Sequence, residues 1–240
     1  MMKQTIELFE IAARDGEKAK HFYESLFNWK MTDIGPMMKI DRSDAGLKGH
    51  ILKWPHKGPT HLTIYIRVEN ISDCLFKVEK LGGKVILQEM KVPSGGSIAQ
   101  FTDLDGNIVA IFQNNEQKSH YLSKDVKDTQ IGFFEIASRE GARAKQFYET
   151  IFNWQLTDVG AEINISKEDA GIKGHILNWT KEDPPYLTIY VRVDNIQHYL
   201  EKIKELGGTI LIPETKIHNG GTFALFKDLD GNIFGISSGR

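Results

Sequence analysis

Hydrophobic and polar positions follow two periods in the first part of the chain. Residues 6–11 are rich in the apolar side chains of a strand, and apolar positions then recur every three or four residues across 17–27. The second spacing is typical of an amphipathic helix, which Asp15 is placed to cap. Short strands are predicted at 29–34, 37–41 and 48–54. The predicted order is therefore one strand, one helix and three strands.

The same order follows in the next part of the chain. Residues 62–68 form a predicted strand, and Asn70 begins a helix that ends at two consecutive glycines, 82–83. Further strands are predicted near 85–88, 97–102 and 107–112, and the Asp-Gly pair at 105–106 favours a tight hairpin turn between the last two.

The whole pattern occurs twice. Phe-Glu-Ile-Ala at 9–12 returns at 134–137, and Gly-His-Ile-Leu at 49–52 returns at 174–177. One constant shift of 125 positions (134 − 9) aligns both pairs without a gap. The sequence predicts two tandem α+β domains: a first copy at 1–113 and a second copy at 130–240. They are joined by a polar linker at 114–129, in which Tyr121 and Leu122 are expected to dock on a domain.

Composition narrows the function classes. The chain is 40% apolar and 26% charged with a net charge of −2, values typical of a globular protein without a basic surface. We therefore expect no nucleic-acid or membrane partner. The single cysteine, Cys74, allows no internal disulfide, and Tyr199 replaces it in the second copy, which indicates packing. A cytoplasmic location is the expectation.

Several local motifs, taken in order, resemble a known superfamily. They are Ala-Lys-x-Phe-Tyr-Glu-x-x-Phe-x-Trp at 19–29, Leu-Gly-Gly at 81–83 and Asp-Leu-Asp-Gly-Asn at 103–107. The set resembles the vicinal oxygen chelate superfamily of glyoxalase I, extradiol dioxygenases and bleomycin resistance proteins, although Leu104 and Leu229 stand where a proline is usual. The resemblance implies paired βαβββ units that form a curved mixed sheet, a cup with its helices outside. Such a cup binds a small molecule and, in the enzymes, a divalent metal.

The resemblance also implies three metal-ligand positions in each copy, and none holds a good ligand. These positions are occupied by Leu8, Thr63 and Ala110 in the first copy and by Phe133, Thr188 and Gly235 in the second. A fourth position, on the strand 48–54, is not placed to the residue. We expect no metal cofactor at the family positions.

Other side chains are candidates for binding a ligand. If, as the resemblance implies, Leu8 and Thr63 point into the cup, strand alternation adds Glu10, Tyr65 and Arg67 to the same face. The arginine there either pairs with the glutamate or binds an anionic ligand. His50 is a structural residue or a ligand contact, and Trp54 borders a variable loop. The candidates are Glu10, His50, Trp54, Tyr65 and Arg67 in the first copy and Glu135, His175, Trp179, Tyr190 and Arg192 in the second. His61 shares the cup face, but Tyr186 replaces it, which confines any catalytic role to one copy.

Three functions remain open. The first is a metal-independent protein that binds, or sequesters, a small molecule. The second is a lyase or dioxygenase of glyoxalase type with a displaced metal held by Glu10, His50, Glu135 or His175. The third is a scaffold with vestigial cups that acts through a protein partner. The sequence assigns no catalytic residue and no ligand, and duplication fits either a monomer with intrachain domain pairing or a homodimer.

Overall fold

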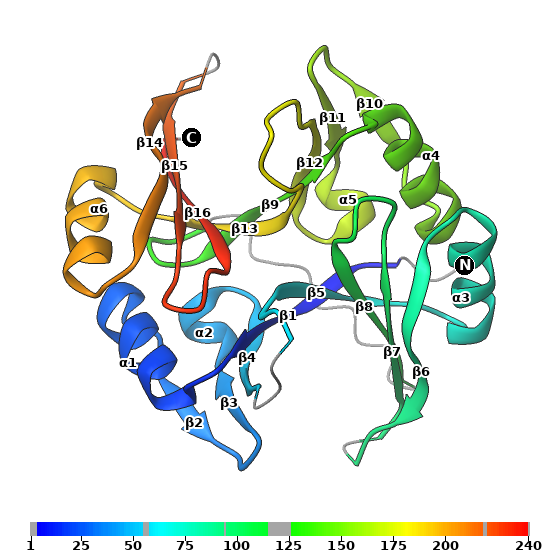
Figure 1. Cartoon of the computed structure of the whole chain (residues 1–240), viewed down its shortest axis with the longest axis horizontal. Helices are drawn as coiled ribbons and strands as arrows, with labels where there is room; N and C mark the ends of the chain where they lie inside the picture. Colours follow the sequence, from blue (N-terminus) through cyan, green and yellow to red (C-terminus); the bar gives the residue numbers. More distant parts are fainter. Residues whose placement is uncertain (1–3, 55–57, 94, 115–125, 218–219, 240) are drawn as a thin grey trace. The chain divides into compact units, whose positions relative to one another are not determined.

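The computed structural model describes residues 4–54, 58–93, 95–114, 126–217 and 220–239, and Figure 1 follows their element order. The order strand, helix, three strands is confirmed four times, with one short additional helix in each copy. The predicted docking of Tyr121 and Leu122 lies outside the described residues. No helix among these residues is long and apolar enough to span a membrane.

The first copy contains eight strands and three helices. They are β1 (Ile6–Ala13), α1 (Gly16–Phe27), β2 (Met31–Asp33), β3 (Met37–Ile40), α2 (Arg42–Ala45), β4 (Lys48–Lys53), β5 (Leu62–Arg67), α3 (Ile71–Lys80), β6 (Lys84–Lys91), β7 (Ser97–Thr102) and β8 (Ile108–Gln113).

The second copy repeats this set. Its elements are β9 (Ile131–Ser138), α4 (Gly141–Phe152), β10 (Leu156–Asp158), β11 (Glu162–Ile165), α5 (Lys167–Ala170), β12 (Lys173–Asn178), β13 (Leu187–Arg192), α6 (Ile196–Glu205), β14 (Thr209–Lys216), β15 (Thr222–Lys227) and β16 (Ile233–Ser238).

Each copy contributes one eight-stranded sheet. The strand orders are β2-β3-β4-β1-β5-β8-β7-β6 and β10-β11-β12-β9-β13-β16-β15-β14. Strands β3 and β4 pair antiparallel, as do β7 and β8, whereas β5 and β8 pair parallel, so the sheet is mixed. The predicted α+β fold with two tandem sheets is therefore confirmed.

The described residues group into two compact units that do not coincide with the two copies. One unit contains residues 4–8, 63–114 without 94, and 134–187; the other contains 9–62 without 55–57, 126–133, and 188–239 without 218–219. Each unit therefore combines the first half of one copy with the second half of the other. The domain limits 1–113 and 130–240 stay a prediction.

A repeated hydrogen bond joins the two copies inside each unit. In the first unit the Tyr148 hydroxyl of α4 donates to Asp103 Oδ2 at 2.8 Å, and in the second unit the Tyr23 hydroxyl of α1 donates to Asp228 Oδ2 at 2.7 Å. Figure 1 shows the turn between β15 and β16 beside α1. Burial raises the pKa of both aspartates, while the bonds from the tyrosines oppose that rise. The repeated Asp-Leu-Asp-Gly-Asn turn thus fastens one copy to the first helix of the other.

Three of the four tryptophans, Trp29, Trp154 and Trp179, lie in the core, and so does the cysteine, as its packing interpretation expects. Trp29 and Trp154 are buried, and their indole nitrogens donate to the carbonyls of Thr129 and Gln4, both at 2.7 Å. Burial raises the pKa of the Cys74 thiol to about 12, so this side chain is a packing residue rather than a reactive thiolate.

Candidate functional site

Two buried glutamates, one in each copy, lie at the centre of two clusters of predicted site residues. In the first copy, Glu10 on β1 is only 3% exposed. Its Oε2 lies 2.6 Å from Nε2 of His50 on β4, and its Oε1 lies 3.5 Å from Nε2 of His61, the residue before β5. We call Glu10, His50, Trp54 and His61 the first-copy site; all four belong to the second compact unit.

His61 is the unusual member of the first-copy site. Its side chain is 11% exposed, and neither ring nitrogen has a hydrogen-bond partner among the described residues. The 3.5 Å approach to Glu10 is close enough for an ion pair but does not have the geometry of a hydrogen bond. The Trp54 ring meets the imidazole edge-on, with the ring centroids 5.4 Å apart.

The second copy surrounds its glutamate differently. Glu135 on β9 lies 2.6 Å from Nε2 of His175 on β12, the same distance as in the first copy. The hydroxyl of Tyr186, the residue that corresponds to His61, donates to Glu135 Oε1 at 2.6 Å. Burial and the nearby Glu135 charge raise the pKa of Tyr186, so the phenol keeps its proton and remains a donor.

A second carboxylate reaches the histidine in this copy. Glu162 Oε2 on β11 lies 3.2 Å from His175 Nδ1, so both ring nitrogens of His175 contact acceptors. Burial lowers the pKa of His175, but the hydrogen bonds to Glu135 and Glu162 outweigh burial and raise it to about 9. The same contact lowers the pKa of Glu162. We call Glu135, Glu162, His175, Trp179 and Tyr186 the second-copy site; all five belong to the first compact unit.

The tryptophans of the two sites also differ. Trp179 is 5% exposed and its indole nitrogen donates to the Asp183 carbonyl at 2.7 Å, whereas Trp54 is half-buried. The guanidinium of Arg139 donates to the carbonyls of residues 179, 181, 182 and 183, which holds the segment after Trp179 in place. In the first copy the corresponding arginine, Arg14, donates to the Gly58 carbonyl at 2.6 Å, so an arginine contact to this loop occurs in both copies.

The two arginines expected on the cup face have partners outside these clusters. Arg67 is buried and forms an ion pair with Glu7, a residue the sequence interpretation did not consider. In the second copy Gly132 replaces Glu7, and Arg192 Nη1 donates instead to the Val126 carbonyl at 3.1 Å. These contacts favour a structural role for both arginines over an anion-binding role.

Side chains at the positions implied for metal ligands do not fit a metal. The hydroxyls of Thr63 and Thr188 donate to the backbone carbonyls of Ile108 and Ile233 at 2.6 and 2.7 Å. A Cβ added to Gly235 would lie 2.3 Å from the Tyr190 ring, so this ring fills the place where a longer side chain would begin. Across the described ranges, no group of three or more His, Cys, Asp or Glu side chains is arranged to hold a metal ion.

The remaining predicted residues are buried aromatics. Tyr190 on β13 packs edge-on against Phe133 and Phe223, with centroids 5.8 and 6.3 Å apart. Tyr65 is its counterpart on β5 and is also buried. The position of Phe133, implied for a metal ligand, is thus part of an aromatic cluster.

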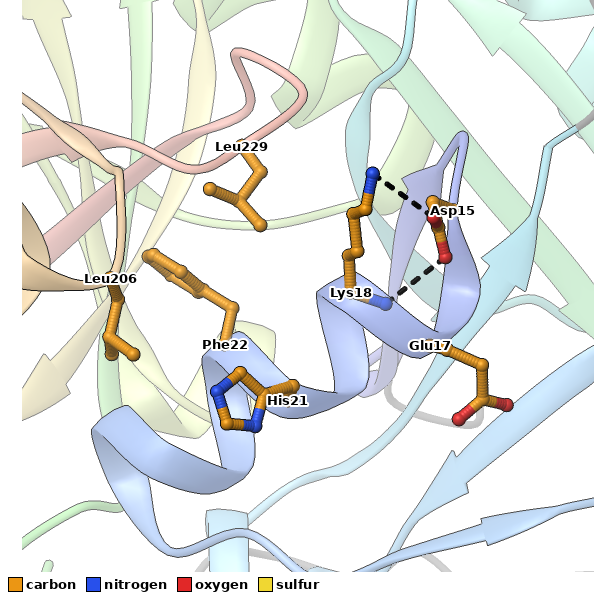
Figure 2. A pocket seen from close by; sticks show the side chains of 7 residues that line it. All are labelled: Asp15, Glu17, Lys18, His21, Phe22, Leu206 and Leu229. Carbon is orange, nitrogen blue, oxygen red and sulfur yellow. Dashed lines mark hydrogen bonds and ion pairs between the residues drawn. The ribbon is translucent and has the colours of Figure 1, made fainter.

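A separate pocket lies in the second compact unit (Figure 2). Its volume is 340 Å³, and Phe22, Leu206 and Leu229 provide its apolar part. The polar side chains around it are exposed, and two of them, Asp15 and Lys18, pair with each other at 3.5 Å. None of the ten candidate residues lines it. Water competes with a ligand for hydrogen bonds to its exposed polar groups, so the pocket is a weaker candidate than the buried sites.

Sequence reasoning did not select two members of the second-copy site, Tyr186 and Glu162, or Glu7, which pairs with Arg67 outside the two sites. Residues 162 and 164 lie on one face of β11, and Asn164 pairs with His175, which brings Glu162 diagonally to the histidine. Alternation along the strand predicts which face of β11 carries Glu162. Only the order of strands in the sheet shows that His175 is its neighbour.

Comparisons with known proteins agree with the fold. A family model described as the glyoxalase/bleomycin resistance protein/dioxygenase superfamily matches residues 5–111 and 130–236. A protein named "Putative glyoxylase CFP32", from Mycobacterium bovis and from Mycobacterium tuberculosis, is 24% identical over 95% of this chain and 92% of its own length.

Solved structures show the same fold at low identity. The Mn(II)-bound glyoxalase from Novosphingobium aromaticivorans aligns with a TM-score of 0.68 and 16% identity, over 99% of this chain and 83% of its own. The 2,3-dioxygenase LapB from Pseudomonas sp. KL28 aligns with a TM-score of 0.66 and 10% identity, over 100% and 93%. With two matched regions that together span most of its length, the chain belongs to the glyoxalase/bleomycin resistance protein/dioxygenase superfamily.

Proposed function

We propose that this protein binds a small molecule without a metal at the positions implied by the family resemblance. The observation that supports the proposal is that, in both copies, the residues at those positions are unsuitable as metal ligands. Their threonine hydroxyls are committed to backbone carbonyls, and the other residues there are apolar or glycine. A loss by one chance substitution does not explain six unsuitable residues, so the binding role does not depend on the metal chemistry of the relatives.

Metal analysis combined with ligand screening tests this proposal. The untagged protein is purified, its transition-metal content is measured by plasma mass spectrometry, and small molecules are screened by thermal shift with and without EDTA. We expect substoichiometric metal and ligand-induced shifts that EDTA leaves unchanged. One metal ion per chain, whose removal abolishes the shifts, would contradict the proposal.

A displaced metal is the second candidate, and one observation favours it. In the first-copy site two imidazoles lie 2.6 and 3.5 Å from one carboxylate, and these are donor types that transition metals bind. This candidate makes the protein a lyase or dioxygenase of glyoxalase type, as in the Mn(II)-bound relative. It predicts stoichiometric metal in the same mass-spectrometry experiment and its loss in His50→Ala.

A further inference from the structure

The geometry points to two sites with different roles. We propose that the first-copy site binds a small uncharged molecule through a hydroxyl group that hydrogen-bonds to His61, while the second-copy site is a closed structural network. This inference rests on the proposed binding function and specifies which site and which side chain carry it.

The first step is the cost of an unsatisfied imidazole. A buried polar group without a hydrogen bond costs about 1–3 kcal/mol, and native proteins contain few of them. The second copy shows how this fold satisfies the position, because Tyr186 donates to Glu135 at 2.6 Å. His61 leaves its nitrogens without such a bond among the described residues. A bound molecule that completes the hydrogen bonds accounts for a histidine at this place.

The second step is the chemistry of the missing partner. The ring nitrogen nearest Glu10, at 3.5 Å from the carboxylate, carries the hydrogen in the favoured tautomer because a carboxylate only accepts. The other nitrogen is then an acceptor, which requires a donor on the ligand. The Glu10 charge disfavours an anion beside the ring. A neutral hydroxyl group meets both conditions.

The third step is access. The side chain of His61 is 11% exposed, but its nitrogens are buried, so the exposed part is carbon. A ligand therefore reaches the acceptor nitrogen only when the His61 side chain or its neighbours move. Trp54 beside it is half-buried, whereas its counterpart Trp179 is buried and bonded to the Asp183 carbonyl. Of the two tryptophans, Trp54 therefore leaves more exposed surface beside its site among the described residues.

Matched probes test the hydroxyl requirement directly. Cyclohexanol and benzyl alcohol are titrated into the full-length protein, each beside the isostere in which methyl replaces hydroxyl, methylcyclohexane and ethylbenzene. Binding is followed by NMR. We expect saturable binding of the alcohols and about tenfold weaker binding of the isosteres, since one hydrogen bond is worth about a factor of ten.

Variants assign the binding to His61. His61→Tyr introduces the second-copy residue, whose hydroxyl can close the site on Glu10, and His61→Phe removes the ring nitrogens; both should weaken alcohol binding about tenfold. His198→Asp, which introduces the first-copy residue at an exposed position, is the control and should bind as wild type does. Circular dichroism confirms that each variant is folded.

Three results would overturn the assignment: isosteres that bind as tightly as the alcohols, His61→Phe that retains full alcohol binding, or no binding by either alcohol. The proposed function can fail separately, because it depends on metal content and on EDTA. A ligand from the thermal-shift screen that binds His61→Tyr as tightly as wild type would leave the binding function standing and place it elsewhere.

Discussion

The first-copy site and the second-copy site share a buried glutamate and a histidine 2.6 Å from it, but two side chains that surround that pair differ. The second-copy site adds a tyrosine hydroxyl on the glutamate and a second carboxylate on the histidine. In the first copy His61 replaces the tyrosine and Met37 replaces the second carboxylate, Glu162.

This difference separates what the fold needs from what a ligand needs. The Glu–His pair occurs in both copies and links two strands of each sheet, so we interpret it as a structural contact. The residue that precedes β5 or β13 then decides whether the cluster is complete, with Tyr186, or incomplete, with His61. The proposed division of roles is that the second copy keeps a stable network while the first copy gives up stability for binding.

The largest expected effect comes from removing the shared acceptor. Glu135→Ala leaves His175 and Tyr186 without the carboxylate that both contact, and breaking a buried charged pair typically costs about 3–5 kcal/mol. Glu10→Ala removes the 2.6 Å contact to His50 but no bond from a tyrosine hydroxyl, because His61 stands at that position, and should cost less. Urea denaturation of both variants measures the difference. An equal or larger loss for Glu10→Ala would show that the first-copy network is the tighter one.

The second prediction uses pH. The pKa of His175 is raised to about 9, so its contribution to stability is fully present below about pH 6.5 and is lost as the pH rises through about 9. The gap in unfolding free energy between wild type and His175→Asn should close over that window. Glu162→Met introduces the first-copy residue and should lower the His175 pKa, which an NMR titration measures. A His175 pKa that is unchanged in Glu162→Met would show that Glu162 does not raise it.

The third prediction compares the two residues that distinguish the sites. Tyr186→Phe removes the donor to buried Glu135 and should cost about 1–3 kcal/mol. His61→Phe removes a side chain without a hydrogen bond in the described structure and should change stability by less than about 1 kcal/mol, or increase it. Thermal unfolding of the matched pair distinguishes them. A larger loss for His61→Phe means that His61 has a structural partner.

The smallest effect lies outside the two sites, at the first helix of each copy. Asp15 caps α1 by accepting from the Lys18 amide at 3.1 Å, whereas Glu140 makes no such bond to α4. Asp15→Ala should lower the free energy of unfolding slightly, and Glu140→Ala should leave it unchanged, as measured by chemical denaturation. Equal losses would show that the copies differ less in local stability than their contacts indicate.

Sequence patterns predict most of this fold because local signals determine it. The helical spacing at 17–27, the cap at Asn70 and the repeated turns correspond to α1, α3 and the hairpins. Two four-residue helices, α2 and α5, were not predicted, since one turn is too short to show a helical period. The strand predicted at 29–34 is shorter, at 31–33, because Asn28 takes a left-handed conformation and Trp29 turns into the core.

The contacts within the sites were less predictable from the sequence, because strand order decides which side chains lie beside each other. Alternation along β1 and β5 suggested Arg67 as a neighbour of Glu10, whereas the partners in the structure include Glu7 for Arg67 and His50 for Glu10. His50 lies 40 residues from Glu10, and β4 beside β1 brings them together. In the sequence, the replacement of His61 by Tyr186 confined any role of His61 to one copy. In the structure, the same replacement distinguishes the two sites, because Tyr186 donates to its glutamate and His61 makes no hydrogen bond among the described residues.

The most direct test of the central claim is the response of the histidine side chains to one alcohol. The protein has eight histidines, whose imidazole nitrogens are observable by long-range 1H–15N NMR. On titration with cyclohexanol, His61 should show the largest saturable shift and His175 should stay unchanged. Methylcyclohexane should shift His61 with an affinity about tenfold lower. An equal response from His175, or no response from His61, would contradict the assignment of binding to the first copy.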